Sequence, residues 1–466
     1  MVFKKAKTGK CILPLQINTI RRSKSEKCNK ITLWLSFILG LIFAVLLVCI
    51  LSIQAGKQLS FWRLIENSSI LENEGNVVSC YYNTPNPTNV TQLTPSNIHP
   101  NLCTHINIAF AQIRNNKIYL EDSQLDVLPG IVKLRKYNPN LKVLLSVGGA
   151  GNDDGFSKMV INHASRKVFI KSIKTILRNH SLDGIDLDWE FPVVKGYQKN
   201  LIKRERQHFS QLLREIRMEY IREKRNYLLT VAVAAPQIIV DVAYDVDQIN
   251  MYVDYANIMT YDFHSYTKFT PFTGLNSPLY ARPEEQLYLA TLNINYTVQM
   301  YKDKGLDPSK IVVGIPTYGH SFALVNANNA EVGSPASGFG TLGNLGFVNY
   351  PDICMFLSKF HDVVIKEDTE AKVPYLHKES EWVSYENADS AVAKAKYITE
   401  NKLRGAMIYS LNADDYDGKC DKLSGIIPFE TVIKYHHCKS RIYCIKKSKA
   451  KKIMQYDLVV VPYNIY

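Results

Sequence analysis

The stretch of sequence that decides the fold is Asp183-Gly184-Ile185-Asp186-Leu187-Asp188-Trp189-Glu190. Its apolar residues alternate with the last three acids, which is the period-two pattern of a β-strand. Asp186, Asp188 and Glu190 therefore share one side of this strand, roughly 7 Å apart along it. One reading is an edge strand with a solvated acidic face. The other is a strand that ends at Phe191-Pro192 where a barrel opens into its active site, and we favour this second reading.

A row of three carboxyl groups on an apolar strand is costly to bury unless the groups share protons or find partners. Desolvation and like charges raise the pKa of such a group, and a carboxyl that stays protonated near neutral pH is a general acid. The pattern therefore indicates acid catalysis.

The motif D-G-x-D-x-D-W-E, as it stands at 183–190, resembles the signature of glycoside hydrolase family 18, the chitinases and chitinase-like lectins. The resemblance runs from about residue 76 to 435. It implies a (β/α)8 TIM barrel domain over 76–435 with a small α+β insertion over 322–389. The alternation of strand-like and helix-like runs predicts the same barrel. The expected strands are 77–82, 105–111, 143–147, 183–190, 228–235, 255–259, 311–316 and 406–411.

The resemblance also implies roles for the acidic residues. Glu190 is the expected general acid, Asp188 orients the 2-acetamido group of the substrate, and Asp186 hydrogen-bonds Asp188 and shuttles a proton. Asp183 is out of phase with this row and is expected to be structural. Tyr261, in the sequence Met259-Thr260-Tyr261-Asp262, is expected to hydrogen-bond the acetamido carbonyl; an ordinary polar cap at a strand end is the alternative.

The remaining residues that the resemblance assigns to substrate binding are Tyr81, Phe110, Gly149, Met259, Asp262, Tyr318 and Tyr409. Aromatic rings suit the flat apolar faces of sugars, and core packing is the alternative for Tyr81 and Phe110. The sequence departs from the family pattern at three positions. Ala150 and Tyr409 stand where tryptophan is usual, and His320 stands where arginine is frequent. We expect these changes to weaken binding of long chitin chains and to leave the proton chemistry intact.

The chain has 466 residues and a formal net charge of +13, and residues 1–30 account for much of that charge. They hold nine Lys and Arg against one Glu, a net charge of +8. The next 23 residues, 31–53, carry no charge. A helix of this length can span a bilayer core of about 30 Å. The basic side is expected to remain cytosolic. We therefore predict a cytosolic tail (1–30), a transmembrane signal anchor (31–53) and a short stem (54–75), with the barrel outside the cell or in a lumen. A cleaved signal peptide is the alternative, but the apolar run exceeds the usual length of such a segment.

Two further features fit an extracytosolic barrel. Glycosylation triplets begin at Asn67, Asn89, Asn179 and Asn295, although so short a pattern also occurs by chance. Six of the nine cysteines follow residue 53, and an even number in an oxidising compartment suggests disulfides. The resemblance implies Cys80–Cys103 and Cys354–Cys420, which leaves Cys438 and Cys444 as candidates for a third pair. These last two belong to a predicted basic tail, 436–466.

These observations predict a membrane-anchored chitinase that hydrolyses β-1,4-linked N-acetylglucosamine in chitin or chitooligosaccharides. No metal ion and no cofactor are expected. The protein is expected to be monomeric and to contact the bilayer through its N-terminal helix. A chitinase-like lectin and an adhesion or growth-factor-like protein on the same scaffold are the alternatives. Such lectins usually lack the acid that Glu190 provides. Nucleic-acid binding is not expected, because so much of the excess charge precedes the apolar segment.

Overall fold

The computed structural model describes residues 76–84, 93–151, 153–194, 199–416 and 420, and three isolated positions before them, Gly40, Phe43 and Val48. The chain divides into two units, Met1–Asn73 and Glu74–Tyr466, and the barrel belongs to the second. Apart from the three isolated positions, the predicted segments 1–30, 31–53, 54–75 and 436–466 lie outside the described residues. No helix among the described residues is long and apolar enough to cross a membrane.

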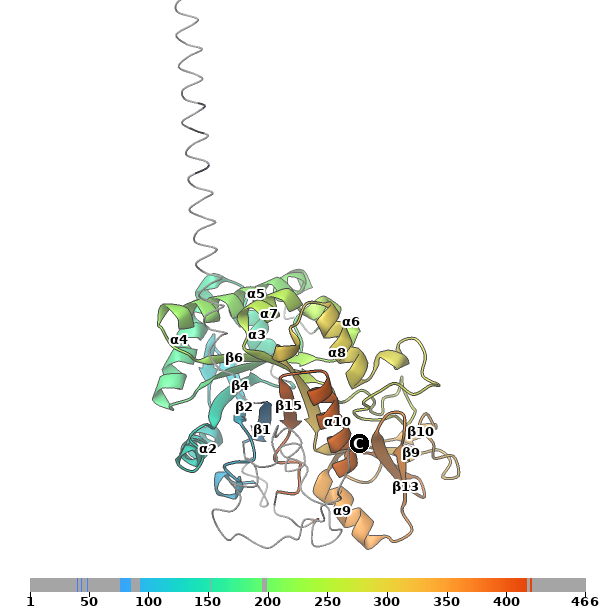
Figure 1. The fold of residues 1–466 in the computed structure, drawn as a ribbon. Helices are drawn as coiled ribbons and strands as arrows, with labels where there is room; N and C mark the ends of the chain where they lie inside the picture. Colours follow the sequence, from blue (N-terminus) through green and yellow to red (C-terminus); the bar gives the residue numbers. More distant parts are fainter. Residues whose placement is uncertain are drawn as a thin grey trace, which may run out of the picture. The chain divides into compact units, whose positions relative to one another are not determined.

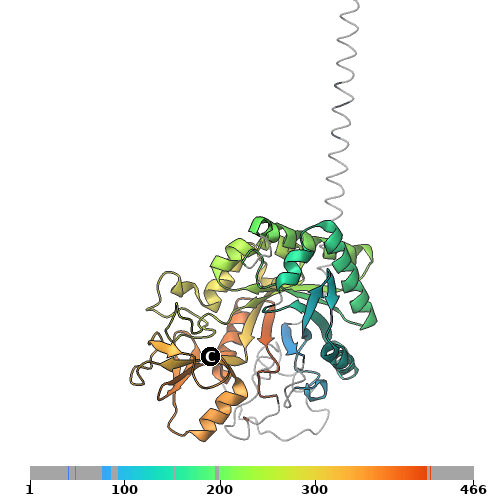
Figure 2. The same ribbon diagram turned by 180° about the vertical axis from the view of Figure 1, so that it is seen from behind.

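Eight parallel strands form a closed barrel (Figures 1 and 2). In chain order they are β1 (Val77–Asn83), β2 (His105–Arg114), β4 (Lys142–Gly148), β5 (Gly184–Asp188), β6 (Leu228–Ala234), β7 (Tyr255–Met259), β8 (Ile311–Pro316) and β15 (Gly405–Tyr409). Each strand pairs with the next, and β15 pairs with β1 to close the ring. A short strand, β3 (Lys117–Tyr119), pairs antiparallel with β2. The predicted (β/α)8 barrel is confirmed.

The barrel strands are buried on both faces, as parallel strands covered by helices must be. Within β4 and β6 only the first residue is partly exposed, and every residue of β5 is buried. Gly184 allows β5 to begin close to β6, because a Cβ atom there would lie 2.3 Å from the carbonyl oxygen of Leu228. Several of these apolar strands nevertheless carry a single buried polar residue. They include Ser146, Thr230 and Asn257.

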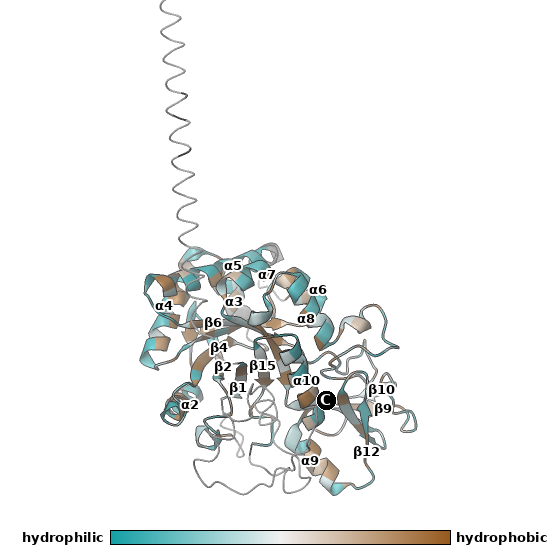
Figure 3. Cartoon of the chain, viewed as in Figure 1, coloured by the Kyte–Doolittle hydropathy of each residue, from teal (hydrophilic) through white to brown (hydrophobic). Residues whose placement is uncertain are grey.

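Helices surround the barrel, and Figure 3 shows hydrophilic residues along their outer faces. They are α2 (Asp122–Lys133), α3 (Asp153–Met159), α4 (His163–Asn179), α5 (Lys199–Arg222), α6 (Gln237–Ala243), α7 (Val246–Tyr252), α8 (Ile294–Asp303) and α10 (Ala388–Glu400). Helix α4 illustrates the pattern. Asn162 caps it by accepting a hydrogen bond from the Ser165 amide, and Phe169, Ile173 and Leu177 form its buried face.

The chain between β8 and α10 forms the predicted α+β insertion. It contains β9 (Tyr318–Leu324), β10 (Ala336–Gly338), β11 (Phe347–Asn349), α9 (Tyr350–Lys359), β12 (Val364–Asp368), β13 (Val373–Lys378) and β14 (Glu381–Ser384). These six strands form one antiparallel sheet, which lies beside α10 in both views (Figures 1 and 2). Its core is built on Trp382, which is fully buried and donates a hydrogen bond to the carbonyl of Ala330.

Two disulfides are present, and they are the two that the resemblance implies. Cys80–Cys103 joins β1 to the segment before β2, and Cys354–Cys420 joins α9 to the chain after β15. Both cross-links close loops and thereby restrict the unfolded chain. Cys438 and Cys444 lie outside the described residues.

Candidate active site

The acidic row lies at the carboxyl end of β5, where barrel enzymes place their chemistry. Asp188 is the last residue of the strand, and Glu190 follows two positions later. The side chains of Asp186 and Asp188 are buried, whereas Glu190 is partly exposed. A partly exposed acid above two buried ones is an arrangement that substrate can reach.

Asp186 is the centre of a hydrogen-bond network inside the barrel. Its Oδ2 accepts from the Tyr81 hydroxyl and the Ser146 hydroxyl, both at 2.7 Å. Its Oδ1 accepts from the Thr230 hydroxyl at 2.6 Å and from the Asn257 amide at 3.3 Å. Burial raises the pKa of Asp186 above its usual value, and these four hydrogen bonds lower it again in part. Residues from four other barrel strands, β1, β4, β6 and β7, therefore hold this carboxyl in one orientation.

Asp188 lacks comparable support. Its Oδ1 is buried without a hydrogen-bond partner. The pKa of Asp188 is raised well above 3.8, first because burial removes solvation and then because the charges of Glu190 and Asp186 lie nearby. A buried carboxyl with a raised pKa and one oxygen available is suited to bind a polar group of a ligand.

This raised pKa gives a test in stability. Folded Asp188 keeps its proton at pH values where the unfolded chain has lost it, so its contribution to stability is full below about pH 4 and is lost as the pH rises through the folded pKa. Asp188→Asn cannot ionise. We expect the variant to lose less stability than the wild type between pH 4 and 8 in urea unfolding. An equal or steeper decline in the variant would show that Asp188 is not the source.

Asp183 lies at the start of the acidic stretch, and both its side chain and its backbone form hydrogen bonds. Its carboxylate accepts a hydrogen bond from the Val143 amide at 2.7 Å and forms an ion pair with Arg135. Its backbone carbonyl accepts from the Leu228 amide at 2.8 Å. Asp183 therefore ties together the starts of β4, β5 and β6.

Aromatic rings surround the strand ends above the acids. Tyr409 lies at their centre, with its ring centroid 5.6 Å from that of Tyr81, 5.8 Å from Tyr261, 6.3 Å from Tyr318 and 6.4 Å from Phe110. The structure thus brings together all five aromatic residues that the sequence assigned to the site. Tyr81 has two functions, because its ring belongs to this wall and its hydroxyl holds Asp186.

Gly149 acts through the backbone. A Cβ atom at this position would lie 2.7 Å from the ring of Phe110, and the residue has a φ of +80°, so a side chain would displace that ring. Its amide also donates to the carbonyl of Asp188 at 2.9 Å. Gly149 therefore shapes the wall beside the acids. Ala150, which follows it, is exposed.

Three more of the predicted residues lie at the end of β7 or just after it. Met259 packs against the aromatic cluster, and Tyr261 is buried with its hydroxyl 3.8 Å from the sulfur of Met407. Burial raises the pKa of Tyr261 well above 10, so its hydroxyl keeps its proton and can donate. Asp262 follows with a φ of +56° and a side chain that is 53% exposed.

Asp262 accepts hydrogen bonds from two residues of β9. The Tyr318 hydroxyl lies 2.6 Å and His320 Nε2 lies 2.7 Å from the same oxygen, Oδ1. From the sequence we expected only that histidine at position 320, where arginine is frequent in the family, removes a fixed positive charge. The structure shows instead that its ring contacts the Asp262 carboxylate, so the polar link between β9 and Asp262 remains.

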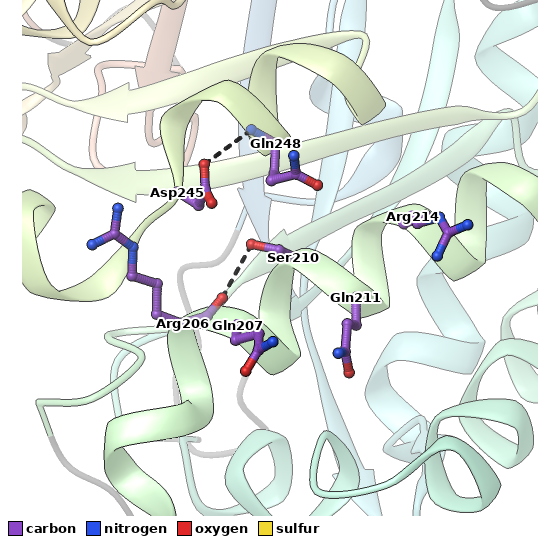
Figure 4. A pocket seen from close by; sticks show the side chains of 7 residues that line it. All are labelled: Arg206, Gln207, Ser210, Gln211, Arg214, Asp245 and Gln248. Carbon is purple, nitrogen blue, oxygen red and sulfur yellow. Dashed lines mark hydrogen bonds between the residues drawn. The ribbon is translucent and has the colours of Figure 1, made fainter. Parts of the chain in front are cut away.

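Other possible sites in the described structure are less suited to this chemistry. Figure 4 shows an open groove of about 390 Å³ on the outer helices. It is lined by Arg206, Gln207, Ser210, Gln211, Arg214, Asp245 and Gln248. The Asp245 carboxylate is occupied as the cap of α7, and the strand-end acids do not border this groove. Within the described ranges, no group of three or more His, Cys, Asp or Glu is placed to hold a metal ion.

Comparison with known proteins agrees with this geometry. Residues 77–414 match the family described as glycosyl hydrolases family 18. The chain is 37% identical to human chitinase-3-like protein 2 over 70% of this chain and 84% of that protein, and 36% identical to mouse chitotriosidase-1 over 71% of each. Among solved structures, the Group IV chitinase of Ostrinia furnacalis in complex with allosamidin has a TM-score of 0.72 and 32% identity, covering 77% of this chain and 98% of that one. Human YKL-39, a pseudo-chitinase with retained chitooligosaccharide binding properties, has a TM-score of 0.70 and 35% identity, covering 78% and 99%. The chain therefore belongs to glycosyl hydrolase family 18.

Proposed function

We propose that this protein is a chitinase that hydrolyses β-1,4 linkages between N-acetylglucosamine units. The observation that carries the proposal is the presence of Glu190 just beyond Asp188, at the open end of the barrel and beneath an aromatic wall. Chitinases of family 18 with known structures share this fold. The test is hydrolysis of fluorogenic chitooligosaccharides by the purified protein, with Glu190→Gln as the inactive reference.

Glu190 is the proposed general acid, which protonates the glycosidic oxygen as the bond breaks. The substrate's own N-acetyl carbonyl attacks the anomeric carbon as that bond breaks and forms an oxazolinium ion, which water then opens to give the sugar product. No second carboxylate therefore has to act as the nucleophile. Asp188, whose pKa is raised by burial and by the nearby Glu190 and whose Oδ1 has no hydrogen-bond partner, orients the acetamido group. Tyr261 donates its hydroxyl to the acetamido carbonyl, and Asp262 contacts the sugar from the exposed side of the site.

Asp186 completes the proposed proton pathway. The pathway passes from Asp186 through Asp188 to Glu190, and the charges of both of these neighbours lie close to Asp188. The four donors fix Asp186. Asp188 in this way links the network inside the barrel to Glu190 at its mouth.

The second candidate function is a lectin that binds chitooligosaccharides without cleaving them. It is favoured by the similarity to human YKL-39. Ala150 and Tyr409, where the family usually has tryptophan, reduce the stacking surface and argue against tight binding of a long chain, because an aromatic contact contributes about 0.5–1.5 kcal/mol. Glu190 favours the enzyme. Tight retention on chitin beads without hydrolysis at any pH from 3 to 8 would support the lectin.

We further propose that the barrel is anchored by residues 31–53 with its N-terminus in the cytosol. The support is the sequence itself, a net charge of +8 followed by 23 uncharged residues. Two of the glycosylation triplets fall on described residues, and their asparagines, Asn179 and Asn295, are exposed. Both features suit a barrel that faces the outside of the cell or a lumen.

This topology gives a direct expectation. Protease added to intact cells should release the barrel, and removal of N-glycans should lower the mass of the released fragment. Replacing the basic residues before residue 31 with neutral ones should impair this orientation, because the positive charges hold the N-terminus inside. Digestion of the barrel in sealed vesicles that expose their cytosolic face would overturn the proposed orientation.

A further inference from the structure

The buried side chain of Asn276, which is 1% exposed, joins two residues at the edge of the candidate site. Its Oδ1 accepts a hydrogen bond from the Asp262 amide at 2.9 Å, and its Nδ2 donates to the Tyr318 carbonyl at 3.0 Å. The Tyr318 hydroxyl in turn donates to the Asp262 carboxylate at 2.6 Å. Because one end of the Asn276 amide meets a donor and the other meets an acceptor, only one orientation of this side chain satisfies both. Asn276 therefore links the backbones of two residues whose side chains also bond each other.

The bond to Asp262 holds an uncommon backbone conformation. Asp262 has a φ of +56°, in the left-handed region, and a residue other than glycine stays there only where the surrounding contacts enforce it. The Asp262 amide donates to the Asn276 side chain, and the Phe263 amide donates to the Asn276 carbonyl at 3.1 Å. Since Asp262 directly follows Tyr261, these bonds fix the peptide on the carboxyl side of Tyr261.

The next residue, Ser277, fixes the peptide on the other side of Tyr261. Its hydroxyl donates to the Thr260 carbonyl at 2.7 Å and accepts from Lys394 Nζ at 3.0 Å. Lys394 forms an ion pair with Glu386, and their side chains are 0% and 2% exposed. A lone charge is costly to bury, so the two partners hold each other in place. Two consecutive residues therefore hold both neighbours of Tyr261.

The insertion supports this pair of residues. The Asn276 amide donates to Ser384 Oγ at 2.8 Å, and Ser384 is the last residue of β14 and 1% exposed. We infer that Asn276 is a positioning residue for Tyr261, and that the insertion holds Asn276 in place through Ser384. The inference rests on the proposed function, since Tyr261 is the group that donates to the acetamido carbonyl in that reaction.

The experiment is steady-state kinetics of the full-length protein on a fluorogenic chitooligosaccharide. Asn276→Ala is expected to lower kcat by roughly 10- to 10²-fold, because a displacement of about 1 Å at a reacting group can cost this much. Asn293→Ala is the matched control and should keep wild-type turnover. Asn293 is 2% exposed at the start of α8, where it accepts from the Tyr296 amide at 2.8 Å and donates to the Ala290 carbonyl at 2.9 Å. It thus has the same burial and the same kinds of bond as Asn276.

A double-mutant cycle separates positioning from a general loss of structure. In a Tyr261→Phe background, Asn276→Ala should lower kcat by less than about threefold, because no hydroxyl is left to misplace. Equal losses of kcat in the two backgrounds, or wild-type turnover by Asn276→Ala alone, would overturn the inference.

Ser384 provides a milder pair of variants, which tests the inference even where Asn276→Ala does not fold. Ser384→Ala removes the acceptor of the Asn276 amide and should lower kcat by roughly three- to tenfold. Ser384→Thr keeps a hydroxyl and should retain turnover. Equal turnover by the two Ser384 variants would overturn the role of the insertion, while an active wild type leaves the proposed function standing. Absence of hydrolysis by the wild type would instead refute the proposed function, and this inference with it.

Discussion

Replacing Glu190 with glutamine is expected to lower turnover of chitooligosaccharides by at least roughly 10²–10⁴-fold, the usual contribution of a positioned general acid. Glutamine has nearly the same shape but no acidic proton to give to the glycosidic oxygen. Binding should persist, because the aromatic wall and Asp262 are unchanged. The measurement is steady-state kinetics on a fluorogenic chitooligosaccharide.

The control is Glu284→Gln, which makes the same chemical change at a side chain that is 70% exposed and in an ion pair with Arg282. It should retain wild-type turnover. Unfolding curves of both variants should match that of the wild type, which excludes a folding defect. Near-normal turnover by Glu190→Gln would show that another group is the acid.

Removing the N-acetyl groups from the substrate is expected to have the second large effect. If the acetamido carbonyl is the nucleophile, glucosamine oligomers lack the attacking group and should be cleaved at least about 10²-fold more slowly, because a well-placed intramolecular group has a very high effective concentration. The comparison uses oligomers of equal length under identical conditions. Similar rates for the two substrates would require a nucleophile from the protein or from water.

Much of the fold could be predicted from the sequence, because buried parallel strands are short apolar runs with clear ends. The eight expected strands correspond to the barrel strands, and β7 and β8 have the predicted bounds. The predicted start of the insertion was less accurate. Its sheet begins at Tyr318 rather than 322, since β9 follows β8 after Thr317 alone and no turn residue marks the change of sheet.

The site shows where sequence reasoning reaches its limit. The row of acids and the strand-end aromatic residues could be predicted because each lies in a recognisable local pattern. The donors to Asp186 could not, since Thr230 and Asn257 come from separate strands and meet it only in the closed barrel. The only sign of these two donors in the sequence is that each is a single polar residue within an apolar run. The contact of His320 with Asp262 was missed for the same reason, because it joins residues 58 positions apart.

The most direct test of the central claim is time-resolved NMR of the first products released from an N-acetylglucosamine hexamer by the wild-type protein. Substrate-assisted catalysis by Glu190, Asp188 and Tyr261 predicts that the new reducing ends appear first as the β anomer and equilibrate to α only later. An initial α anomer, or the absence of any cleavage from pH 3 to 8, would contradict the account.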